Sequence, residues 1–103
     1  MIYLEKAMAQ DVKTKDEIIC DWRARGFSCD LWEDPPGRRW ENYRHDTDEV
    51  IYVLEGVFEL EVSGEKRTLK PGEEAFIPAQ SNHSVRNIGG TWTRWLYGYR
   101  FGK

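Results

Sequence analysis

Two histidines and a nearby glutamate are the residues of this sequence best suited to metal chemistry. His45 and His83 are the only histidines among the 103 residues, and Glu49 follows His45 by four positions. Two neutral imidazoles and a carboxylate with open coordination positions suit Fe(II), and they bind Mn, Ni or Zn with less selectivity. Both group types are in their ligand form near neutral pH. One interpretation of this set is therefore a three-residue metal site.

The same residues also have an ordinary interpretation. If no bulge intervenes, equal parity places His45 and Glu49 on one strand face together with Ile51. A buried carboxylate must then be protonated, paired with a cation or bound to a metal, because an unpaired buried charge is very costly. Arg86 or Arg94 could be that cation, and the histidines would be ordinary hydrogen-bonded residues. The residues alone favour this ion pair over a metal.

Short β-strands are predicted to position these side chains. Turn signals divide the second part of the chain into eight segments, at residues 27–33, 38–45, 49–54, 57–62, 67–69, 75–77, 83–88 and 91–101. This pattern is typical of an all-β sandwich or barrel, and no βαβ alternation is present. A small antiparallel barrel can hold one small ligand inside. Polar residues that point inward are therefore the functional candidates.

One short α-helix is predicted before the strands, at about residues 15–25. Thr14 and Glu17 have the spacing of a capping box, and Gly26 is a good stop signal. The apolar stripe that includes Trp22 is narrow, which predicts a helix lying against the outside of another element. We expect an N-terminal arm and helix at residues 1–26, packed on a barrel at residues 27–103, within one domain.

Charge and composition exclude several classes of protein. Fifteen basic and eighteen acidic residues give a net charge of −3, so charge offers no argument for a nucleic acid or an anionic membrane as partner. The sequence lacks a spanning apolar run and a signal-peptide core, which predicts a cytoplasmic protein. Cys20 and Cys29 fit neither a zinc motif nor CxxC, so we expect free thiols.

Aromatic residues make up 14% of the chain, which is more than a small monomeric barrel readily covers. We therefore predict a homodimer, partly through an N-terminal arm that contains Ile2 and Leu4. Period-two spacing would give the last strand one aromatic face, which is more often core or dimer interface than a platform for a substrate. The residues of that face are Trp95, Tyr97, Tyr99 and Phe101, and further interface candidates are Trp32, Trp40 and Trp92.

The segment from Gly37 to Gly56 resembles the first motif of the cupin superfamily. That motif reads Gly, five residues, His-x-His, three or four residues, Glu, six residues, Gly. Here Gly37, His45, Glu49 and Gly56 fall at the expected spacings, and Tyr43 stands in place of the first His. The resemblance implies a small single-domain cupin, with the fold of a double-stranded β-helix, or jelly roll.

The segment from Gly72 to Asn87 resembles the second cupin motif. Gly72, Pro78, His83 and Asn87 match its spacing, and 15 residues separate the two motifs. Gln80 replaces a turn glycine, which predicts a different turn shape near His83. Asn87 is expected to bond local backbone groups.

In metal-containing cupins the motif histidines and glutamate hold a divalent ion, so the resemblance implies His45, Glu49 and His83 as ligands. Tyr43 is expected to donate a hydrogen bond next to the ligands or to pack as an aromatic, ahead of ligation, because a phenol has a pKa near 10. Arg39 and Glu41 share the parity of Tyr43 and could reach the barrel mouth. There Arg39 could pair with a substrate carboxylate, although a solvent-exposed strand end is the stronger expectation.

Two functional classes are weighed most closely. The first is a metal-dependent enzyme of the oxygenase, isomerase or lyase type acting on a small polar metabolite, with Tyr43 and Glu49 as catalytic residues. The second is a non-catalytic cupin that binds a sugar or an organic acid, with or without metal. A storage or structural protein is disfavoured by the short chain without repeats.

Overall fold

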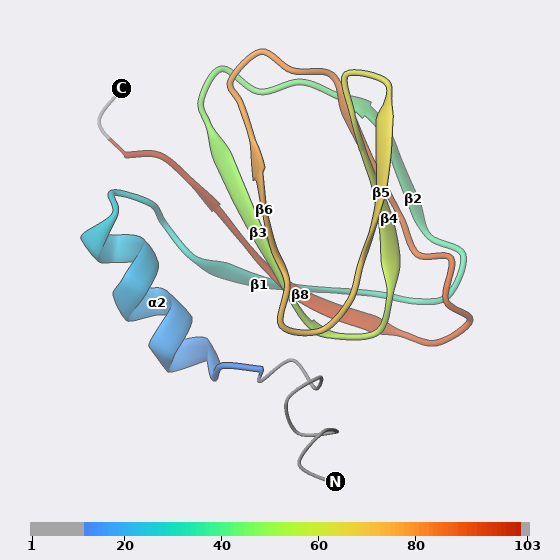
Figure 1. Ribbon diagram of the computed structural model, residues 1–103, viewed down its shortest axis with the longest axis horizontal. Helices are drawn as coiled ribbons and strands as arrows, with labels where there is room; N and C mark the ends of the chain where they lie inside the picture. Colours follow the sequence, from blue (N-terminus) through green and yellow to red (C-terminus); the bar gives the residue numbers. More distant parts are fainter. Residues whose placement is uncertain (1–11, 102–103) are drawn as a thin grey trace, which may run out of the picture.

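Residues 12–101, the part of the chain that the structure describes, contain two four-stranded antiparallel sheets (Figure 1). The structure is a computed structural model. One sheet has the order β1-β8-β3-β6 and the other the order β2-β7-β4-β5, and the two face each other as a barrel. This confirms the predicted all-β jelly-roll fold. The strands are β1 Asp30–Asp34, β2 Arg39–Tyr43, β3 Glu49–Glu55, β4 Phe58–Val62, β5 Glu65–Leu69, β6 Glu74–Ile77, β7 His83–Arg86 and β8 Thr93–Tyr99.

The strand boundaries differ from the sequence prediction in two informative places. Strand β5 begins at Glu65, two residues before the predicted start. It is an edge strand with four exposed polar residues, so its first residues carry no apolar signal. Strand β2 ends at Tyr43, which leaves His45 in the loop to β3.

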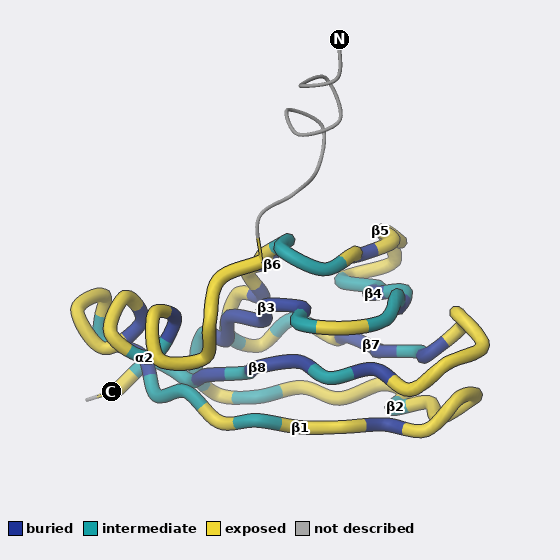
Figure 2. Tube along the Cα trace, turned by 90° about the horizontal axis from the view of Figure 1, so that it is seen from below, coloured by how far each residue is buried: buried dark blue, intermediate teal, exposed yellow. Residues whose placement is uncertain are grey.

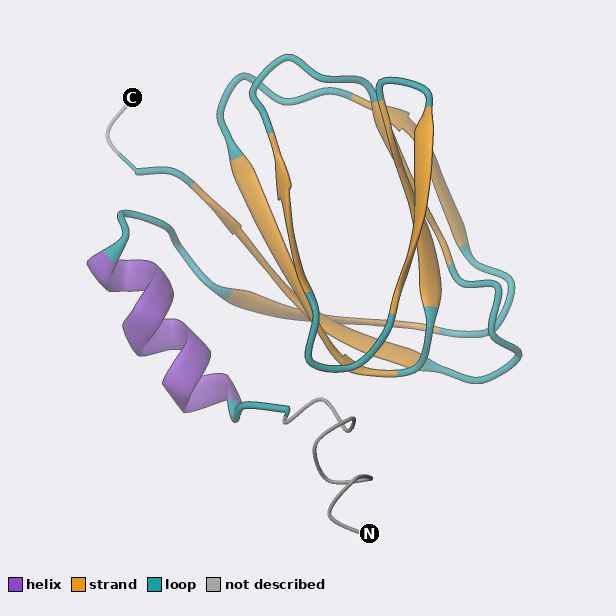
Figure 3. Ribbon diagram, in the orientation of Figure 1, coloured by secondary structure: helices purple, strands orange, loops and turns teal. Residues whose placement is uncertain are grey.

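The predicted helix is present as α2, Lys15–Ala24, and lies outside the first sheet (Figure 3). Both hydrogen bonds of the capping box between Thr14 and Glu17 are formed. The buried face of the helix carries Ile18 and Trp22, which pack with Val50 and other residues on the outer face of the sheet. Figure 2 shows β3 and β8 buried along much of their length, with α2 beside them.

Packing on both sides explains why β3 is apolar at both parities. Ile51 and Val53 point into the barrel core with Phe58 of the opposite sheet, whereas Val50 and Tyr52 meet the helix. Glu49 shares the parity of Ile51 and lies at the barrel end of the same inner face.

A bulge in β2 overturns the parity argument for Arg39 and Glu41. Trp40 pairs with Val85 and Tyr43 with His83, so three steps on β2 oppose two on β7. Asn42 absorbs the extra residue with a φ of 58°. Consequently Trp40, not Glu41, shares the inner side with Tyr43. Arg39 is exposed and pairs with Glu41 at 3.0 Å, as the exposed alternative predicted.

Asn87 has the structural role expected of it. Its side-chain amide donates to the carbonyl oxygens of Asp34, Pro35 and Thr91, at 3.3, 2.9 and 2.7 Å. These bonds fasten the end of β1 to the loop before β8. Loop backbone groups buried near β7 thereby find partners.

Several expectations concern the chain outside the core. Ile2 and Leu4, predicted in a dimer arm, lie outside the described residues. Cys20 and Cys29 are free thiols, as predicted. Among residues 12–101, no helix is long and apolar enough to cross a membrane.

Candidate metal centre

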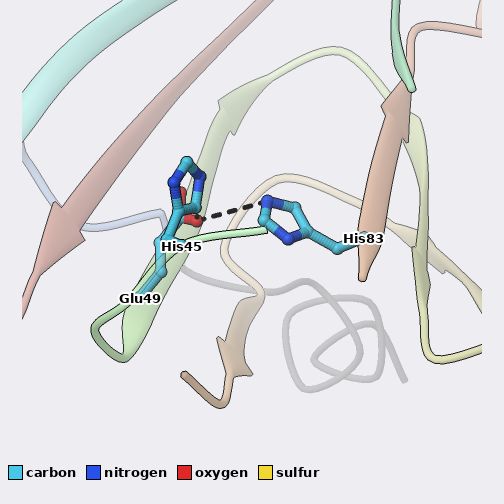
Figure 4. Close-up of side chains that lie close together, drawn as sticks. All are labelled: His45, Glu49 and His83. Carbon is cyan, nitrogen blue, oxygen red and sulfur yellow. Dashed lines mark ion pairs between the residues drawn. The ribbon is translucent and has the colours of Figure 1, made fainter. Parts of the chain in front are cut away.

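Three separate elements bring His45, Glu49 and His83 together (Figure 4). Glu49 is the first residue of β3, and His83 is the first residue of β7 in the opposite sheet. His45 lies in the loop between β2 and β3. One ligand atom from each residue lies within 4.8 Å of the other two. The positions that the cupin resemblance implied as ligands therefore lie together at one end of the barrel.

Glu49 supplies a buried oxygen without a partner. The residue is 4% exposed, and its Oε1 atom has no hydrogen bond among the described residues. The Nε2 atoms of His83 and His45 lie 3.5 and 3.6 Å from this oxygen, beyond strong hydrogen-bond range. Burial raises the pKa of Glu49 to about 8. A carboxylate at this position needs a cation to compensate for its lost hydration.

Neither histidine supplies that cation near neutral pH. Burial lowers the pKa of both His45 and His83, so both imidazoles are neutral and their contacts with Glu49 are not ion pairs. The Nδ1 atom of His83 lies 3.3 Å from the carbonyl oxygen of Ser81, which places the ring proton on Nδ1. The lone pair of Nε2 then points toward Glu49, as a metal ligand requires.

The arginines considered as partners of Glu49 are engaged elsewhere, so the ion-pair interpretation is wrong. Arg86 bonds three carboxylates at 2.8–2.9 Å, and Arg94 bonds two at 2.9 and 3.2 Å. The partners of Arg86 are Glu41, Glu59 and Glu61, and those of Arg94 are Glu33 and Glu55. Two imidazoles and an orphaned buried carboxylate fit a divalent ion.

A cavity of about 200 Å³ opens beside the three residues. Its wall is largely aromatic and includes side chains that sequence reasoning assigned to core or interface. The lining residues are Trp32, Trp40, Tyr43, His45, Glu49, His83, Val85, Trp95, Tyr97 and Tyr99. The period-two spacing of aromatic residues in β8 correctly predicted that Trp95, Tyr97 and Tyr99 share one face of the strand. Such spacing does not show whether that face lines a pocket or packs in the core. Trp92 is 57% exposed and remains an interface candidate.

Tyr43 and Tyr99 occupy different places in this cavity. Tyr43 is 42% exposed at the rim, and its ring stacks on His45 with centroids 6.5 Å apart. Tyr99 faces Glu49 across the β3–β8 ladder, and its hydroxyl lies 3.4 Å from His45 Nε2. Burial, with the nearby Glu49, raises the pKa of Tyr99 to about 12. Tyr99 is thus a protonated donor beside the candidate ligands, a role that sequence reasoning had considered only for Tyr43.

Gln80 adopts the positive φ angle expected of the glycine at this motif position. Its φ is 68°, the left-handed conformation that glycine would adopt, so the prediction of a different turn shape is wrong. The Gln80 backbone N–H donates to the carbonyl oxygen of His45 at 2.8 Å, and its side chain donates to Asp46 at 3.2 Å. These bonds offset the strain and tie the His45 loop to the turn before His83.

Residues 30–99 match the family model described as the cupin domain. The chain belongs to the cupin family. The TT1209 protein of Thermus thermophilus is 32% identical to this cupin, with a TM-score of 0.66 and 72% of each chain covered. An RmlC-like cupin from Shewanella frigidimarina shares the fold, with 20% identity, a TM-score of 0.67, and 76% of this chain and 68% of that chain covered.

Two curated relatives match part of this cupin. A protein named polyketide synthase CurC, from Streptomyces cyaneus, is 33% identical over 60% of this chain and 41% of its own length. A protein named 5-nitrosalicylic acid 1,2-dioxygenase, from Bradyrhizobium, is 34% identical over 62% of this chain and 31% of its own length. The match thus spans less than half the length of either relative.

Proposed function

We propose that this cupin binds a divalent metal ion through His45, Glu49 and His83, and that the ion serves catalysis on a small polar metabolite. The observation that carries the proposal is the Glu49 Oε1 atom, which is buried, has no hydrogen-bond partner among the described residues, and lies between two neutral imidazole nitrogens. Removing either histidine or the carboxylate would leave too few ligands for tight binding.

The chemistry of the donor set favours Fe, Mn, Ni or Zn. Three protein ligands leave coordination positions open, and a bound ion would polarise the oxygen of a substrate there. The three side chains come from well-packed strand ends and a loop held by Gln80, so they would be positioned before the ion binds. Such preorganisation supports a catalytic role.

The tyrosines are proposed to handle substrate protons. The Tyr99 hydroxyl, protonated at neutral pH, would donate a hydrogen bond to a substrate oxygen beside His45. Tyr43, exposed at the rim, would contact the more distant part of the substrate. The similarity to a protein named as a dioxygenase supports an oxygenase reaction among the oxygenase, isomerase and lyase types.

Metal analysis tests the proposal. Protein purified without added metal or chelator is expected to contain about one ion per chain, or to take up one of the four candidate ions. The His45→Ala/His83→Ala double variant and Glu49→Gln should lose it, whereas Glu41→Gln, a carboxylate on the outer face, should keep it. Equal metal content in wild type and the double variant would overturn the proposal.

The second candidate is a non-catalytic cupin that binds a small ligand. The aromatic cavity favours it, because apolar walls with few polar groups are typical of binding sites in general. Turnover of a bound metabolite that Glu49→Gln abolishes, with binding retained, would identify catalysis. Binding without turnover would identify the second candidate.

A further inference from the structure

Six aromatic rings form a closed circuit around the cavity, which we call the aromatic rim. Trp32 and Tyr43 are 41% and 42% exposed, so the circuit opens to solvent. Neighbouring ring centroids lie 5.0–6.5 Å apart in the order Trp32, Trp40, Tyr43, His45, Tyr99, Tyr97 and back to Trp32.

Most neighbouring rings of the aromatic rim are steeply inclined to one another, so they enclose a box and not a flat slot. The ring of Trp32 is inclined at 69° to Trp40 and at 79° to Tyr97, and the ring of Trp40 is inclined at 59° to Tyr43. Trp95 extends the wall inward and is inclined at 55° to Tyr97. A flat aromatic ligand stacks best between parallel rings, whereas a rounded group can contact several inclined rings at once.

A buried carboxylate holds three of these indoles in place. Asp34 is 2% exposed and accepts hydrogen bonds from the Nε1 atoms of Trp32, Trp40 and Trp95, at 2.9, 3.1 and 3.3 Å. The indole N–H groups therefore point at Asp34, and the rings present carbon surface to the cavity. The charge of Asp34 behind the rings makes that surface more attractive to a cation.

Among residues 12–101, the cavity lining contains no Lys or Arg. Glu49 carries the one carboxyl group among the lining residues. Arg38 lies outside the lining, yet its guanidinium is 4.0 Å from the centroid of the Trp40 ring. The rim indole thus already holds a cation against one side. An anionic group far from the metal centre would meet aromatic π faces, with no Lys or Arg among the lining residues to pair with it.

We propose that the aromatic rim binds a methylated onium group, quaternary ammonium or sulfonium, carried by a small zwitterion. Its carboxylate would lie at the metal centre, and this part of the inference rests on the proposed function. Attraction of an onium group by several partly desolvated aromatic rings is the established use of such boxes. The onium part of the inference needs no metal.

Three probes of matched shape test the proposal by calorimetry on the full chain. Glycine betaine carries a trimethylammonium group, tert-butylacetic acid has the same shape with carbon in place of the cationic nitrogen, and salicylate is a flat aromatic acid. With metal bound, betaine is expected to bind roughly 5- to 30-fold more tightly than its carbon analogue. Equal or weaker binding of betaine would overturn the proposal, and tighter binding of salicylate would assign the site to flat aromatic acids.

Tetramethylammonium separates this inference from the proposed function. In chelator-treated protein it should bind and quench tryptophan fluorescence, because the box needs no metal. Trp32→Leu should weaken that binding about fivefold or more, while Trp92→Leu, exposed and outside the lining, should not change it. Failure of tetramethylammonium to bind folded protein that does bind metal would overturn only the onium inference. Binding by a protein that takes up no metal would overturn only the metal proposal.

Discussion

The Nε2 atom of His83 lies 3.5 Å from the Oε1 atom of Glu49, across the space between two strands of opposite sheets. Each residue opens its strand, so the cavity end of the barrel places a neutral imidazole against a buried carboxylate. The distance is too long for a strong hydrogen bond and short enough for both atoms to reach one ion. This relationship underlies the first two predictions.

Bound metal should raise the free energy of unfolding strongly, and this effect should depend on the three candidate ligands His45, Glu49 and His83. At a free metal concentration a hundredfold above Kd, binding adds about 2.7 kcal/mol to the free energy of unfolding. For a domain of this size, that raises Tm by roughly 10–20 °C. A thermal melt with Mn²⁺ or Zn²⁺ measures the shift, which His83→Ala should abolish. A shift of the same size in His83→Ala would show that the ion binds elsewhere.

Glu49→Gln should have opposite effects with and without metal. In chelator-treated protein the substitution removes a buried carboxylate that has no partner, so stability should stay unchanged or rise by about 1 kcal/mol. With metal present the variant should be less stable than wild type, because it binds the ion weakly. Urea denaturation under both conditions gives the two values. A large loss of stability in the metal-free variant would indicate a structural role for Glu49.

The pattern of strands and turns predicted an all-β barrel. The three candidate ligands were implied only by the resemblance to the cupin motifs, because the residues alone favoured an ion pair between Glu49 and an arginine. The spacing of Gly37, His45, Glu49 and Gly56 carries that resemblance. The composition of the cavity wall was not predictable in the same way. The bulge at Asn42 changes which side chains of β2 face the cavity, and the residue types in the strand do not predict a bulge there.

The aromatic residues show a second limit of sequence reasoning. Alternation along β8 correctly placed Trp95, Tyr97 and Tyr99 on one face, although Phe101, predicted with them, lies beyond the strand and is exposed. Periodicity also does not say what lies opposite that face. The answer depends on how far the two sheets separate at the open end of the barrel. The convergence of three indoles on Asp34 is likewise a tertiary contact between strands that no spacing predicts.

Acid should lower the stability of the protein slightly by protonating Glu41, which pairs with Arg86 on the outer face of the second sheet. The hydrogen bond from Arg86 lowers the pKa of Glu41 to about 2 from its usual 4.5. A lowered carboxyl pKa means that the stabilisation is present above about pH 4.5 and is lost as the pH falls toward 2. Because Glu41 is exposed, the effect should be small. Melting curves from pH 5 to 2 should fall less steeply for Glu41→Gln, and parallel curves would contradict the prediction.

The glycine that ends the first motif should be less replaceable than one in an open turn. Gly56 has a φ of 84°, and a Cβ atom there would lie 2.6 Å from the carbonyl oxygen of Trp92. Gly64 has nearly the same φ, 88°, with nothing within 4 Å of the added atom. Both alanine variants incur the left-handed penalty of about 1 kcal/mol, but Gly56→Ala also forces the backbone near β8 to move.

The free energies of unfolding should therefore separate the two variants. We expect Gly64→Ala to lose about 1 kcal/mol, and Gly56→Ala to lose at least about 2 kcal/mol more because backbone cannot yield as a flexible side chain can. Gly56 directly follows β3, at the opposite end from its first residue, Glu49, so displacement of the Trp92 loop should leave the metal site intact. Equal losses in the two variants would show that the conformation alone, and not the contact with Trp92, requires glycine at this position.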